Sequence, residues 1–193
     1  MIATNRRSAF LLVTVLVVAP TLSFGSGFAL FEHGNRGMAM AGAMTAVADD
    51  PSALFWNPAG MAFQTDKGIQ LMAGVTLISP TQTFYGESPY PGDGYVEELQ
   101  DQIFPPVHLY LAIPVNERLE VSFSVNNPWG LGTLWDDDHL GRYISRKAEL
   151  TSWDLGISMA YKISDNFAFG LGVDWIYSRL ELTQAVGLIN PFN

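Results

Sequence analysis

Apolar residues recur at every second position over long segments of this sequence after residue 68. In the clearest segment, 151–163, every odd position from Trp153 to Ile163 is apolar, and the even positions hold Ser, Asp, Gly, Ala and Lys. Successive side chains of a β-strand point to opposite faces, so this pattern predicts a strand with one apolar and one polar face. The chain is therefore expected to be all-β and antiparallel, with four further strands in segments 69–77, 107–113, 119–125 and 167–177.

The apolar faces of the two longest predicted strands indicate contact with lipid. Aromatic residues lie near their ends, among them Trp153, Tyr161, Trp175 and Tyr177, as in the aromatic girdles of transmembrane β-barrels. The opposite faces carry mainly small residues and Asp, which suit a lumen, and strands of about 9 to 11 residues match a tilted membrane strand. A soluble β-sandwich is the alternative, because its strands alternate as well.

The connections between these strands alternate in length. Two are tight, at residues 113–119 and 163–167, and both contain Asn with an acidic residue. Two are long, and we place their loops at Ser79 to Phe104 and at Trp129 to Ala148. Outer-membrane barrels have short periplasmic turns and longer external loops, so both long loops are expected outside the cell.

The N-terminus has the features of a secretory signal. Arg6 and Arg7 precede an apolar run from Ala9 to Leu22, and small residues follow. We predict a cleaved signal peptide at residues 1–25, and hence export to the outer membrane of a Gram-negative cell. A transmembrane helix is less well supported, because the run is shorter than the roughly 18 to 20 apolar residues that span a bilayer.

Residues 26–65 do not read as strands. The stretch from Gly37 to Ala48 is rich in Ala and Met and predicts a helix, which Asp49-Asp50-Pro51 should end. A second short helix is expected after Ser52 and should stop at Asn57-Pro58. We expect this compact helical segment to sit in the barrel lumen as a hatch, ahead of the first barrel strands in residues 66–193.

Composition and spacing exclude several kinds of chemistry. The chain has no Cys, and its 19 Asp and Glu residues outnumber 10 Lys and Arg, so a nucleic-acid partner is not expected. The run Asp136-Asp137-Asp138 with His139 is better explained as a solvated loop than as a cation site, because it lacks the spacing of a calcium loop. We assign no catalytic residue, no metal site and no cofactor.

Several blocks, in order along the chain, resemble one known family. They are Ser26-Gly27-Phe28, Ala48-Asp49-Asp50, Asn57-Pro58-Ala59-Gly60-Met61, Phe104-Pro105-Pro106-Val107-His108 and Gly141-Arg142-Tyr143. Together they resemble the FadL/TodX family of outer-membrane transporters. The resemblance implies a barrel of about fourteen strands with an N-terminal hatch, which passes long-chain fatty acids or aromatic hydrocarbons. It also implies three partners: a hydrophobic ligand, outer-membrane lipid and the barrel-assembly machinery.

The resemblance also points to particular residues. Asn57, Pro58 and Ala59 form the hatch motif, with Asn57 expected to be buried, and Phe28 and Leu30 are candidate ligand-pocket residues. A kink in the barrel wall is expected at Asn126, Asn127, Pro128, Trp129 and Gly130. Pro128 has no N–H for a ladder and Gly130 weakens a strand, although the strand could equally end there and the external loop begin. Such a kink would release ligand sideways into lipid.

Five strands cannot close a barrel, and an open sheet would leave unpaired edges in lipid. We therefore interpret the sequence as the N-terminal part of a longer protein or as a truncated gene product. Two other classes stay open. One is a structural or adhesive barrel, which should lack the Asn57-Pro58-Ala59 hatch, and the other is an outer-membrane hydrolase whose site lies beyond Asn193.

Overall fold

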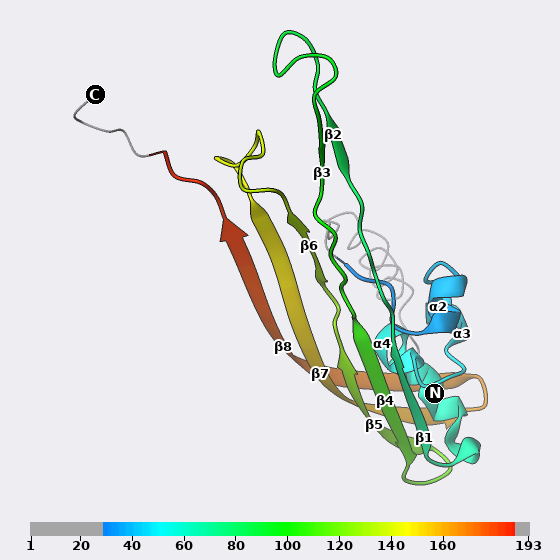
Figure 1. Ribbon diagram of the computed structural model, residues 1–193. Coiled ribbons are helices and arrows are strands. Elements are labelled where there is room, and N and C mark those ends of the chain that lie inside the picture. Colours follow the sequence, from blue (N-terminus) through cyan, green and yellow to red (C-terminus); the bar gives the residue numbers. More distant parts are fainter. Residues whose placement is uncertain (1–28, 188–193) are drawn as a thin grey trace, which may run out of the picture.

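A computed structural model describes residues 29–187, and its main element is a six-stranded antiparallel sheet with short helices on one face (Figure 1). All five predicted strands are present. The predicted signal peptide and Phe28 lie outside the described residues. The strands follow one another across the sheet, with β5 and β6 sharing one edge of β7 and β8 on its other edge. Their bounds are β1 Gln70–Val75, β4 Val107–Pro114, β5 Leu119–Asn126, β6 Gly130–Leu134, β7 Lys147–Ser164 and β8 Phe167–Thr183.

Three further strands were not predicted. β2 (Thr83–Tyr85) and β3 (Val96–Glu98) form a separate two-stranded hairpin within the first long loop. β6 and the start of β7 lie inside the segment expected to be a single loop from Trp129 to Ala148. Three-residue strands are too short to show a period, and Gly130-Leu131-Gly132 has none, which explains both omissions.

The two ends of the sheet differ (Figure 1). Tight turns connect β4 to β5 and β7 to β8 at one end, and in the first of them Asn116 Oδ1 accepts hydrogen bonds from the N–H groups of Arg118 (2.9 Å) and Leu119 (3.0 Å). The hairpin β2–β3 and the connection between β6 and β7 lie at the opposite end. The expected alternation of short and long connections is therefore realised as two distinct ends.

The two faces of the sheet carry opposite kinds of side chain. The apolar residues of β7 and β8 lie on the open face, where Ile157 is 57% and Val173 74% exposed. Polar residues such as Glu120, Ser122 and Ser152 lie buried on the other face. A soluble sandwich would bury its apolar face, so this arrangement argues against that alternative and matches a sheet whose apolar side meets lipid.

The helical segment packs against the polar, inner face of the sheet. Its elements are α2 (Asn35–Ala39), α3 (Met44–Val47), α4 (Ala53–Trp56) and the 3-10 helices η2 (Pro58–Phe63) and η3 (Thr65–Lys67). A small apolar core joins them to the wall and includes Ala53, Met61, Tyr110, Ala112 and Ala160. Within residues 29–187, no helix combines the length and the apolar character needed to cross a membrane.

The single helix predicted from Gly37 to Ala48 is wrong. The chain turns between α2 and α3, where Ala41 and Gly42 have φ angles of 51° and 81°. A Cβ on Gly42 would lie 3.3 Å from the Trp56 ring, so the chain turns there in close contact with α4. The second predicted helix is present as α4, and it stops before Asn57-Pro58 as expected.

Candidate functional site at a break in the wall

The wall of the sheet is interrupted between β5 and β6, although their common neighbour β7 is continuous. β5 ends with Asn126 opposite Asp154, and β6 begins with Gly130 opposite Thr151. Three residues on one side therefore face two on the other, which is a one-residue bulge. Just beyond it Leu131 has a φ of 94°, a backbone conformation that is costly for a bulky side chain.

Side chains replace the ladder hydrogen bonds at this bulge. Asn127 Oδ1 accepts from the Val107 N–H (2.8 Å), and Asn127 Nδ2 donates to the Ser152 carbonyl (2.6 Å). The Ser152 hydroxyl accepts from the Trp129 N–H (2.9 Å) and donates to the Trp129 carbonyl. Asn127 thus connects β4 to β7 across the break, and the backbone groups that it reaches are satisfied.

The beginning of the described chain lies in this break. Ala29 forms a bridge with Trp129, and the Leu30 N–H donates to the Pro128 carbonyl (2.9 Å). Leu30 is only 6% exposed, and a Cβ on Gly130 would lie 3.1 Å from its Cδ1. Glycine at position 130 therefore leaves the space that Leu30 occupies.

A hollow of about 500 Å³ adjoins the break. This volume falls within the range of small-molecule sites, roughly 300 to 1,000 Å³. Its apolar lining combines the proposed pocket residue Leu30 and the kink residue Trp129 with residues from neighbouring elements: Phe104, Pro106, Leu150 and Trp153. The arrangement can hold an apolar molecule beside the wall by burial alone, and it contains no pair of groups placed for covalent chemistry.

His33, which shows no metal-ligand spacing with the other histidines in the sequence, connects Leu30 at the break with the rest of the hatch and with the wall. Its Nε2–H donates to the Leu30 carbonyl (2.8 Å), and its ring stacks on Phe55 with centroids 3.6 Å apart. The Tyr110 hydroxyl of β4 donates to the His33 carbonyl (3.0 Å). Burial lowers the pKa of His33 to about 4, so the ring stays neutral near pH 7. An isolated His without ligand spacing carries no sequence signal for this role.

The hatch motif positions the hatch against β8. Asn57 Nδ2 donates to the Thr45 carbonyl (2.9 Å), and Asn57 is half-buried where the sequence analysis expected it to be buried. Pro58 is the first residue of η2. A Cβ on Gly170 would lie 2.5 Å from the Ala59 backbone nitrogen, so the backbones of hatch and wall are in direct contact.

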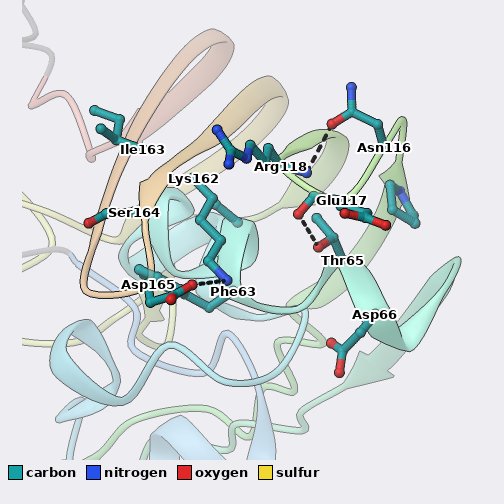
Figure 2. A pocket seen from close by; sticks show the side chains of 12 residues that line it. Phe63, Thr65, Asp66, Asn116, Glu117, Arg118, Lys162, Ile163, Ser164 and Asp165 are labelled. Atoms are coloured by element: carbon teal, nitrogen blue, oxygen red, sulfur yellow. Dashed lines mark hydrogen bonds and ion pairs between the residues drawn. The ribbon is translucent and has the colours of Figure 1, made fainter.

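A larger hollow, about 820 Å³, lies at the end with the tight turns (Figure 2). Its surroundings are polar: Lys162 Nζ lies 3.1 Å from a carboxylate oxygen of Asp165, and the Thr65 hydroxyl donates to the Glu117 carbonyl (3.0 Å). The Thr65 bond fastens the end of the hatch to the turn between β4 and β5, and an apolar ligand would gain little in these surroundings. Among residues 29–187, no cluster of three or more His, Asp or Glu is placed to hold a metal ion.

The family comparison fits this geometry. Residues 16–192 match the model of the family described as outer membrane protein transport protein (OMPP1/FadL/TodX). The chain belongs to this family. The resemblance seen in the sequence is thereby confirmed, and the family consists of transport proteins of the outer membrane.

Individual relatives of the FadL/TodX family are distant in sequence. The long-chain fatty acid transport protein of Escherichia coli K12 is 25% identical over 177 residues, which cover 91% of this chain and 39% of that protein. Outer membrane protein P1 of Haemophilus influenzae is 27% identical, with 93% of this chain and 42% of that protein covered. The crystal structure of a Pseudomonas aeruginosa FadL homologue matches with a TM-score of 0.63 and 26% identity, over 82% of this chain and 39% of that one. The chain spans about 40% of the length of the curated relatives it matches.

Proposed function

We propose that the complete protein carries small hydrophobic molecules, such as long-chain fatty acids or aromatic hydrocarbons, across the outer membrane and releases them sideways at the break between β5 and β6. In this proposal residues 1–25 are removed on export, the barrel-assembly machinery inserts the protein, and the long loops face outward. The carrying observation is a break in the wall whose backbone groups are satisfied by Asn127 and Ser152, with an apolar hollow beside it.

Lateral release has an energetic reason. A hydrophobic molecule that leaves through water re-exposes its surface at a cost of about 25 cal/mol for each Å². A gap in a lipid-facing wall avoids that cost, but it is normally excluded because each unsatisfied backbone group in hydrocarbon costs several kcal/mol. The hydrogen bonds of Asn127 and Ser152 remove this objection at the bulge.

In this proposal, Leu30 and the residues beside it close the gap between β5 and β6. Leu30 fills the space over Gly130, held by one backbone hydrogen bond to Pro128 and by His33 behind it. A ligand that displaces the Leu30 side chain gains an apolar site of similar character, so exchange of one for the other needs no large net free energy. Opening is therefore coupled to occupancy of the hollow.

Deletion of Pro128 tests the proposal. Removing one residue makes the pairing register of β5 and β6 with β7 continuous, so the bulge should close. In the full-length protein we expect cellular uptake of a labelled long-chain fatty acid and of a labelled aromatic hydrocarbon to fall while the barrel remains folded. Pro128→Ala is the matched control, because it keeps the extra residue and should transport normally. Normal uptake by a folded deletion variant would refute lateral release.

A further inference from the structure

The two long connections lie at the end opposite the tight turns (Figure 1). Residues of both line a second apolar hollow. Its volume is about 510 Å³. The hairpin β2–β3 and its tip contribute Phe84 and Tyr90, and the connection from β6 to β7 contributes Trp135, Leu140 and Ile144. Large apolar side chains therefore form most of its lining, although the surrounding segments are rich in polar residues.

Hydrogen bonds between the two connections hold the walls of this hollow in place. The Leu140 N–H donates to Glu97 Oε1 (2.9 Å), and the Gln100 N–H donates to the Leu134 carbonyl (2.8 Å). Gln100 Nε2 also donates to Asp136 Oδ1 (2.6 Å). The hollow is thus formed by two distant parts of the sequence that hydrogen bonds hold together.

Both ring nitrogens of His139 and one carboxylate oxygen of Glu97 already have hydrogen-bond partners at the hollow. The His139 ring stacks on Trp135 with centroids 5.5 Å apart, its Nε2–H donates to the Ser145 carbonyl (2.7 Å), and its Nδ1 accepts from the Gly141 N–H (3.1 Å). Glu97 Oε1 accepts from Leu140 and from the Tyr95 hydroxyl. A ligand therefore meets aromatic and aliphatic surface and finds no free hydrogen-bonding group on His139.

The surrounding charge opposes an anion. Residues 79–104 contain five carboxylates and no cationic side chain, and residues 135–146 contain three carboxylates and two arginines, a formal charge of −6 for the two segments with His139 neutral. Arg146 pairs with Asp137, and Arg142 donates to the carbonyls of Asp138 and His139. Glu97 is the one formally charged side chain among the described residues that line the hollow. A carboxylate entering it would be repelled and would find no cationic partner.

We propose that this hollow is an outer binding site for uncharged aromatic hydrocarbons and that it discriminates against fatty-acid anions. Stacking on Trp135, Phe84 and Tyr90 together with apolar burial provides the affinity, and the acidic surroundings provide the selectivity. The oxygen Glu97 Oε1 is already bonded to Leu140 and Tyr95, and the second oxygen, Oε2, lies 3.7 Å from His139 Nδ1. Its role as a capture site rests on the proposed transport function, whereas its ligand preference does not.

The preference can be measured on the full-length protein in lipid nanodiscs, with empty nanodiscs as the blank. Three probes share one ring system: anthracene, 9-anthroate and 9-anthracenylmethyl-trimethylammonium, each detected by energy transfer from tryptophan. We expect anthracene to bind about tenfold more tightly than 9-anthroate at low salt, and the gap to narrow as salt screens the loop charges. Equal or tighter binding of 9-anthroate, or tightest binding of the ammonium probe, would overturn the proposed selectivity.

Variants of lining residues test whether the energy-transfer signal comes from a probe bound in this hollow. Ile144→Ser removes apolar lining and should weaken anthracene binding about fivefold, whereas Tyr143→Ser alters an exposed neighbour outside the lining and should change nothing. Trp135→Phe should abolish most of the energy transfer. Unchanged affinity and transfer in Ile144→Ser and Trp135→Phe would place the probe elsewhere and reject the site. Deletion of Pro128 should leave this binding intact, so failure of the transport proposal and failure of the binding site give different results.

Discussion

The two edges of β7 show how one strand can support both a closed wall and a broken one. Along one edge β8 pairs with β7 from Lys147 opposite Thr183 to Ser164 opposite Phe167, and the register shifts only beside the turn. Along the other edge β5 and β6 share β7, with the bulge between them. Because β7 is common to both, the difference originates in residues 127–129 and their contacts.

The comparison shows that at this break side chains take over the hydrogen bonds that the backbone makes on the regular edge. On the regular edge, ladder bonds suffice, and Gly170 of β8 brings the hatch into backbone contact. On the broken edge, Asn127 and Ser152 supply the bonds, and Leu30 fills the space. One edge therefore supports the hatch, and the other edge is the place where lateral release is proposed.

The largest effect is expected from Asn127→Ala, which removes the side chain that bridges the broken edge of β7. The variant leaves the Val107 N–H and the Ser152 carbonyl without partners, at about 1–3 kcal/mol for each group. Urea unfolding of the full-length protein in lipid vesicles should show a loss of roughly 2–6 kcal/mol. Ser158→Ala, at a position of β7 that is regularly paired with both β5 and β8, is the control and should change stability by less than about 0.5 kcal/mol. Equal stability of the two variants would contradict the role given to Asn127.

Gly170→Ala tests the regular edge. The added Cβ would lie 2.5 Å from the Ala59 nitrogen, so the hatch has to shift, at a cost of about 1–3 kcal/mol. We expect faster protease cleavage within residues 35–67 with little change in the barrel. Gly172→Ala is the matched control, since its Cβ would meet a Ser158 side-chain carbon at 3.2 Å and no hatch atom. Identical cleavage rates would show that the contact with Ala59 does not hold the hatch.

His33 gives the closure at the broken edge a pH dependence. Its pKa is about 4 when the hatch is docked, below the ordinary 6.5, so the released form binds a proton first as pH falls. Docking is therefore fully stable above about pH 6.5 and weakens progressively toward pH 4. The protease sensitivity of the hatch should rise over this window. His33→Gln keeps a donor for the Leu30 carbonyl and cannot titrate, so a slope that persists in this variant would assign the effect to other groups.

Asn57→Ala should have the smallest effect. It removes one hydrogen bond, to the Thr45 carbonyl, from a half-buried position, which corresponds to about 0.5–1.5 kcal/mol. We expect slightly reduced uptake and a barrel that assembles normally. Thr45→Ala is a suitable control, because the bond uses the backbone of Thr45 and survives that change. Uptake equal to that of the unmodified protein would remove Asn57 from the hatch mechanism.

Sequence reasoning located the wall because lipid contact enforces a strict period of two. Every odd residue of 153–163 faces one side, and that face fixes β7 without any knowledge of its neighbours. The predicted strand nevertheless began at 151 and β7 begins at Lys147, since the apolar residues Ala148 and Leu150 stand at even positions, out of phase with the odd apolar positions of 153–163. β6 was missed for a different reason, because the glycines at 130 and 132 carry no side chain to alternate.

At the candidate site, the sequence alone indicated an irregular backbone. Pro128 has no N–H for a ladder and Gly130 weakens a strand, whichever residues lie next to them in the fold. The partners were beyond sequence reasoning. Asn127 bonds to Val107 and Ser152, which lie 20 and 25 residues away, and only the strand register brings them together. The same holds for Leu30, which the sequence analysis named for a pocket without placing it over Gly130.

Among the described residues, β6 is paired along one of its two edges. Among residues 29–187 it pairs with β7 alone, and on its other side Gln100 makes one backbone bond to Leu134 at the far end. Swinging β6 away from β4 therefore breaks no ladder between them. Leu131 is held at a φ of 94°, which is costly for a bulky side chain, so strain and one-sided pairing both lower the stability of β6 relative to its neighbours. We therefore expect β6 to separate from β7 before the regularly paired hairpin β7–β8 opens, starting at the bulge where three residues face two.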